Sequence, residues 1–176
     1  MLLRKINAAL SLLTTVLLLN HAGFLAIWMI TNGGIEKSST PVPWVLMWIV
    51  ALHAIISIVL AVLGHRNAEK RKCNSYPKLN RGTMIQRVSG ILMLAFIPLH
   101  VLGAAGVMTP PKLVHFILPP LFFAIVLSHV AVSTSKALIT LGIGNAKAVK
   151  IVDVIIKALC AVTLITAMIG FYLYAV

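Results

Sequence analysis

Acidic residues and cysteines are both scarce in this sequence. Its 176 residues include only three Asp and Glu against 15 Lys and Arg, for a formal net charge of +12. The two cysteines, Cys73 and Cys160, lie in a polar and an apolar stretch respectively. So few acidic and thiol ligands, with no short-range His/Cys cluster, argue against a disulfide framework and a zinc site. Flavin, nucleotide and iron–sulfur motifs are also missing, which excludes an enzyme carrying those centres itself.

Apolar residues are what the chain has in excess. They make up 60% of it, with a mean hydropathy of +1.03, which is too apolar for a soluble globule. A membrane-spanning helix needs about 20 such residues. We therefore predict an all-α membrane protein, a single domain over residues 1–176. The first span is too long for a cleaved signal peptide and should be retained. The five predicted helices are 6–31, 43–65, 85–108, 113–141 and 149–175, with a basic loop at 66–84.

The positions of the basic residues predict an orientation in the membrane, which explains the positive charge without a nucleic-acid partner. Lys and Arg gather before the first predicted helix, between the second and third, and around the junction of the last two. The positive-inside rule places these segments in the cytoplasm. We expect a multi-pass protein of the cell's inner (cytoplasmic) membrane, with its N-terminus in the cytoplasm, its C-terminus outside, and lipid around it.

An internal repeat relates the first two predicted helices to the next two. Pro43 precedes His53 by ten residues, and Pro119 precedes His129 by ten. A duplication of this kind would relate two parallel hairpins by an axis along the membrane normal and make equivalent histidines face each other. The expected pairs are His21 with His100 and His53 with His129. Chance similarity between apolar helices is the alternative.

Histidine inside a membrane span suggests function, because a polar ring in hydrocarbon is costly without a partner. A single one can simply bond between helices. Four, one on each of four helices, favour haem, whose iron accepts two imidazoles when its task is electron transfer. We predict that four helices form a haem-binding bundle with a fifth helix added. His21, His53, His100 and His129 would ligate the iron of two haem b groups, or of one. His65 and His115 are expected at the membrane interfaces.

The segment from Thr83 to Gly90 resembles the start of a helix in the cytochrome b membrane anchors of succinate dehydrogenases and fumarate reductases, including their five-helix dihaem members. It contains Arg87-Val88-Ser89-Gly90, similar to the Arg-x-Ser/Thr-Gly motif of that superfamily. The resemblance implies that Arg87 and Thr83 lie beside a quinone and that Ser89 and Gly90 pack next to haem. The chain departs from that pattern in lacking a histidine in its last helix.

These features together predict a haem b subunit that passes electrons between the quinone pool, menaquinone or ubiquinone, and a flavoprotein, iron–sulfur or other redox subunit. The chain itself would be non-catalytic or reactive only with quinone. Asp153 is a further quinone-site candidate as a proton relay, although pairing with Lys157 four residues later is the simpler role. A cofactor-free anchor or assembly protein, and a small transporter with midplane histidines, are the alternatives.

Overall fold

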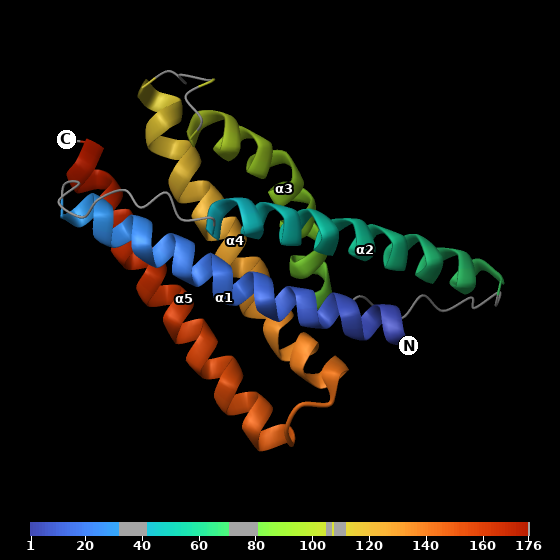
Figure 1. The fold of residues 1–176 in the computed structure, drawn as a ribbon. Coiled ribbons are helices and arrows are strands. Elements are labelled where there is room, and N and C mark those ends of the chain that lie inside the picture. The colour runs from blue at the N-terminus through green and yellow to red at the C-terminus, as the bar shows by residue number, and fades with distance from the viewer. Residues whose placement is uncertain (32–41, 71–80, 105–106, 108–111, 176) are drawn as a thin grey trace.

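The structure is a bundle of five long helices joined by short connections (Figure 1). This computed structural model describes residues 1–31, 42–70, 81–104, 107 and 112–175. All five helices are long and apolar enough to cross a membrane, and no strand occurs among the described residues. The predicted all-α membrane fold is therefore confirmed. The helices are α1 (Leu2–Ile30), α2 (Val42–Lys70), α3 (Arg81–Ala104), α4 (Lys112–Leu141) and α5 (Ala146–Ala175).

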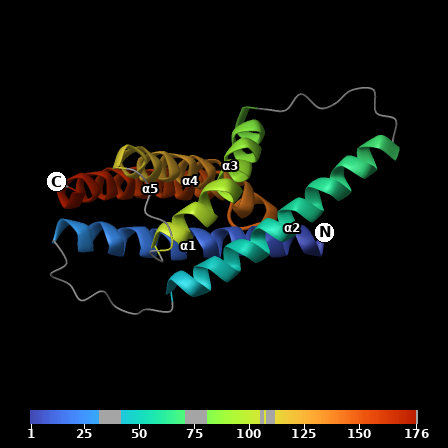
Figure 2. The ribbon, with the colours of Figure 1, turned by 90° about the horizontal axis from the view of Figure 1, so that it is seen from above.

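Three of the helices form the packed centre. In the described part of the chain, the backbones of α1, α4 and α5 approach one another closely, whereas the backbone of α2 comes close only to α1 and that of α3 only to α4. Figure 2 shows α2 and α3 crossing the other three helices obliquely. The fifth helix of the predicted fold, α5, packs within the bundle and makes its most extensive contact with α1.

Small residues explain the close approach of α5 to α1. A Cβ atom placed on Gly170 would lie 3.0 Å from the backbone oxygen of Ala26, so the glycine lets the two backbones meet. Ala22, Ala26 and Ala167 are also buried. Membrane helices associate through small residues of this kind, because the hydrophobic effect gives no net attraction between two helices that already lie in lipid.

Most of the remaining core lies between α4 and its neighbours. Leu127 and Val130 of α4 pack with Cys160 of α5, and leucines of α1 cover this cluster. Large apolar side chains elsewhere on all five helices are exposed, as expected of surfaces that face lipid.

A tight turn joins α4 to α5. Gly142 and Gly144 both have positive φ angles, of 72° and 76°, a region that glycine adopts without the steric cost of a Cβ. The side chain of Asn145 accepts a hydrogen bond from the backbone N–H of Ala148 at 2.9 Å, which caps the start of α5. The turn therefore makes α4 and α5 adjacent antiparallel helices.

Candidate functional site

His21 of α1 and His100 of α3 lie beside each other. Their ring centroids are 6.5 Å apart and their planes are nearly perpendicular, at 83°. The ring of Phe122 lies 5.2 Å from that of His100 and stacks on Phe96, so the pair has an aromatic wall. The sequence repeat had predicted that these two histidines would be neighbours. Whether they hold a haem iron stays a prediction.

The spacing of this pair can be compared with that of two imidazoles on one metal ion. A metal–imidazole bond is about 2 Å long and the ring centre lies about 1 Å beyond the nitrogen, so trans ligands have centroids about 6 Å apart. The observed separation is close to that value. The helices that carry the pair, α1 and α3, have no Cα atoms within 8 Å of each other in the described residues. The two rings therefore meet across helices whose backbones stay apart.

His129 of α4 is held by the start of α3. Its Nδ1 lies 3.1 Å from the backbone oxygen of Gln86 and 3.1 Å from the hydroxyl of Ser89. Ser89 donates its own proton to the backbone oxygen of Ile85 at 2.6 Å, so both neighbours of Nδ1 act as acceptors. Nδ1 must then carry the ring proton. This tautomer leaves the lone pair on Nε2, which is the state that binds a metal.

Gly90 lies against the same ring. A Cβ atom at this position would be 3.4 Å from Cε1 of His129, so a larger side chain would press on the imidazole. Ser89 and Gly90, which the resemblance placed next to haem, thus lie with Gln86 against the ring of His129.

His53 of α2 is the fourth histidine of the set. Its Nδ1 is buried and has no hydrogen-bond partner among the described residues. It lies near enough to His129 for the charges of the two rings to interact. A buried ring nitrogen without a partner is costly, although the imidazole as a whole also interacts with the backbone of Asn7. Asn7 and Ser57 exchange hydrogen bonds of 3.1 and 3.2 Å next to it and join α1 to α2.

The donor set fits haem better than a bare metal ion. Within the described residues, no group of three or more His, Cys, Asp or Glu side chains could hold a metal. Each site offers two imidazoles, whereas a zinc ion requires about four ligands. A porphyrin supplies the other four positions itself, so two histidines are enough.

The residues predicted to lie beside quinone do not all come together. Thr83 accepts a hydrogen bond from Nζ of Lys136 at 3.0 Å, and Arg87 is exposed and close enough to Lys136 for charge repulsion. Asp153 instead bonds Lys157 at 2.6 Å on α5, and α5 makes no close backbone contact with α3 in the described residues. Asp153 is therefore separate from Thr83 and Arg87.

Nothing in the sequence assigns Lys136 to a site, because it is one of several basic residues near a helix junction. Its ammonium donates to Thr83 and, at 2.9 Å, to the side-chain oxygen of Gln86. Gln86 thus contacts Lys136 with its side chain and His129 with its backbone. Only the position of α3 against α4 reveals this connection.

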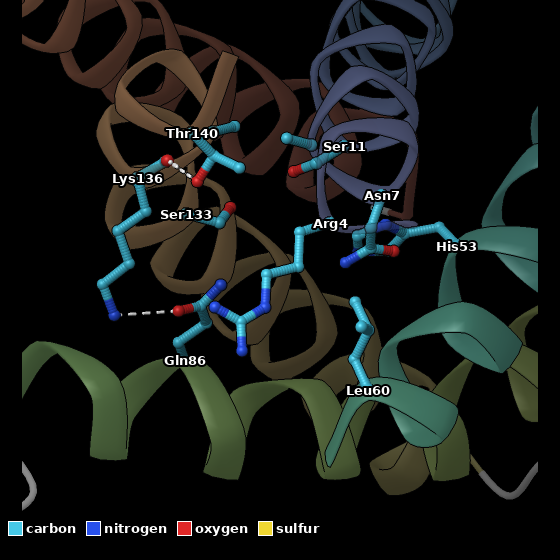
Figure 3. Close-up of a pocket in the computed structure, with 11 residues that line it drawn as sticks. Arg4, Asn7, Ser11, His53, Leu60, Gln86, Ser133, Lys136 and Thr140 are labelled. Carbon is cyan, nitrogen blue, oxygen red and sulfur yellow. Dashed lines mark hydrogen bonds between the residues drawn. The ribbon is translucent and has the colours of Figure 1, made fainter. Parts of the chain in front are cut away.

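Two cavities lie near these residues. One, of about 240 Å³, has a lining that is half polar and half apolar, and we call it the polar cavity. Figure 3 shows Arg4, Gln86 and Lys136 around it together with Asn7 and His53. The other is a largely apolar groove of about 470 Å³ between α3 and α4, and its lining includes Arg81, Ser89 and Ser128. The groove reaches Ser89, one of the partners of His129.

The remaining histidines and cysteines add no chemistry to this site. The side chains of His65 and His115, and all of Cys73, lie outside what the structure describes. Cys160 is a free thiol buried in the apolar cluster of α4 and α5.

No protein-family model, characterised protein or solved structure matches the chain. The similarity of residues 83–90 to the succinate dehydrogenase and fumarate reductase anchors therefore stands on that motif alone.

Proposed function

We propose that this protein is a haem b electron carrier of the membrane, a subunit that exchanges electrons between a quinone and a partner oxidoreductase. A haem with two imidazole ligands supplies a low-spin iron that changes between ferric and ferrous states. The observation that carries the proposal is the 3.1 Å contact between Nδ1 of His129 and the backbone oxygen of Gln86. A carbonyl oxygen can only accept, so we infer that Nδ1 is the donor and that the Nε2 lone pair is left for a metal.

The protein's own residues have separable roles in this proposal. His21 and His100 form one ligand pair, and His53 and His129 form the other. The backbone oxygen of Gln86 fixes the ring orientation of His129 and raises its basicity, as carbonyl partners of metal-bound histidines do. Exposed apolar side chains and the surrounding lipid keep water from the pairs.

The quinone part of the proposal is supported by the apolar groove between α3 and α4. A quinone is an apolar ring with two carbonyl acceptors. The groove offers apolar walls from Met84 and Leu92, and Arg81 at its edge can donate to a carbonyl. Arg87 and Thr83 lie on the same helix as Arg81, and the resemblance keeps them as candidate quinone ligands. Asp153 is on α5, away from this groove, and remains a candidate only as a proton relay.

The docking partner and the membrane belong to the same proposal. A flavoprotein or iron–sulfur subunit would provide the chemistry that this chain lacks. The basic helix ends would face the cytoplasm of the cell by the positive-inside rule, and an odd number of spans puts the two ends of the chain on opposite sides, as their places at opposite ends of the bundle allow (Figure 1).

The transporter alternative has less support than the carrier. Alternating-access sites are built from helices that are interrupted near the midplane. In the described residues, α3 continues through Pro98 and α4 continues through Pro119 and Pro120. A cofactor-free anchor would retain the same fold without binding haem.

A reduced-minus-oxidised spectrum of the purified protein, with haem measured per chain, tests the proposal. We expect a sharp low-spin α-band near ~560 nm and about two haems per chain, or about one if a single pair is used. A folded, monodisperse protein that contains no haem after expression with ample haem supply would refute it and favour the anchor.

A further inference from the structure

The polar cavity has the composition of an anion site. Arg4 of α1 and Lys136 of α4 both line it, and the structure places Arg87 within electrostatic range of Lys136. Asp153, the one acidic residue whose side chain the structure describes, is paired with Lys157. Positive charge therefore converges on the cavity with no described carboxylate to neutralise it.

Neutral polar groups complete the lining. Asn7, Ser11 and Ser133 contribute side chains, as does Gln86. The amide oxygen of Gln86 accepts from Lys136, so its NH₂ group is left to donate elsewhere. In Figure 3 the guanidinium of Arg4 extends toward Gln86 from the opposite side to Lys136. An oxygen anion between them would meet charged donors from two helices and a neutral donor from a third.

The size and position of the cavity suit a phosphate group. Its volume of about 240 Å³ is several times the roughly 30 Å³ that one water molecule occupies in the liquid. It lies where α1 and α3 begin and α4 ends, the end of the bundle that the positive-inside rule assigns to the cytoplasmic headgroups. Each Lys or Arg near the membrane surface raises the affinity for anionic lipid about fivefold.

We propose that this cavity binds a phosphate group, carried by an anionic phospholipid or free in solution. The inference does not depend on haem binding. Arg4 and Lys136 supply the charge, and Gln86 supplies a neutral donor between them. Bound phosphate would also link the start of α1 to α3 and α4.

Native mass spectrometry of the full chain in detergent tests the proposal. The protein is titrated with phosphatidylglycerol, phosphatidylcholine and inorganic phosphate. We expect phosphatidylglycerol to bind at least about tenfold more tightly than phosphatidylcholine. Competition by millimolar inorganic phosphate would identify free phosphate as a second source, whereas its failure to compete would assign the site to lipid.

Two double variants locate the binding. Arg4→Gln with Lys136→Gln removes two charges from the cavity and should weaken phosphatidylglycerol binding by about 30-fold. Lys147→Gln with Lys150→Gln removes two exposed charges at the same end, outside the cavity, and should change it little. If the first double variant fails to fold, Arg4→Gln alone tests the site. Arg4 is exposed at the start of α1, so its substitution should leave the fold intact. The single substitution should weaken phosphatidylglycerol binding about fivefold.

Three outcomes would overturn the proposal. The first is equal binding of phosphatidylglycerol by both double variants, and the second is no lipid or phosphate binding by the unaltered chain. The third is a cavity variant that loses haem but keeps its lipid, since these cations would then serve the haem carboxylates. The haem measurement is separate, so a protein without haem can still support the phosphate site.

Discussion

Replacing histidines two at a time distinguishes the pairing in the structure from every other pairing. Four ligands can be divided into pairs in three ways. The structure places His21 beside His100, and His53 is within electrostatic range of His129, so we propose this pairing. Alanine at both members of one pair should remove one haem and leave the other, so the chain retains about half of its haem. Alanine at one member of each pair should remove both.

The design has an internal control for loss of stability. Of the four possible cross-pair variants, two complementary ones are used, His21 with His53 and His100 with His129. Together they remove the same four imidazoles as the two within-pair variants, so nonspecific damage is matched between the classes. Haem per chain is measured by pyridine haemochrome on protein that elutes as a single species. Should only one pair hold haem, one within-pair variant retains it and both cross-pair variants lose it. Equal haem in the two classes would refute the pairing.

Three further results follow from particular contacts. Gly170→Val should lower the free energy of unfolding in mixed micelles by about 1–3 kcal/mol, because its side chain would meet the α1 backbone, whereas Gly23→Ala, with open space around it, should cost nothing. Asp153→Asn should lower the free energy of unfolding by about 0.5 kcal/mol or less, since its lysine partner is half exposed. It should leave the rate of quinone reduction unchanged. A lower rate at unchanged stability would instead identify Asp153 as a proton relay. Lys136→Gln should lower the reduction potential of the nearer haem by roughly 20–60 mV, because losing a positive charge favours ferric iron, while potentiometry of Lys147→Gln should show no shift.

The five spans could be predicted from the sequence because lipid imposes a simple rule. A segment must be apolar for about 20 residues and must satisfy its backbone within a helix. The predicted helices accordingly overlap those of the structure, and the largest differences lie at their ends. For example, α2 continues to Lys70 and α3 begins at Arg81, because polar residues can extend a helix beyond the hydrocarbon.

The packing could not be predicted in the same way. Small residues occur in several of the helices, so the sequence does not show that Gly170 meets Ala26 and brings α5 into the centre. The proximity of His21 to His100 could be predicted because the repeat supplied a long-range relation, whereas haem ligation by the four histidines stays a prediction. The partners of Lys136 and the lining of both cavities had no such relation, since they depend on how α3 crosses α4.

Gln86 joins the two sites proposed for this protein. Its backbone oxygen orients His129, and its side-chain oxygen holds Lys136 at the edge of the polar cavity. A phosphate bound in the cavity would partly neutralise Lys136, as the Lys136→Gln substitution does completely. Both changes weaken the positive potential near His129, so anionic lipid should shift the reduction potential in the same direction as the substitution and by less. In the substituted protein the same shift should require about fivefold more lipid, because the cavity has lost one of the two charges that bind it.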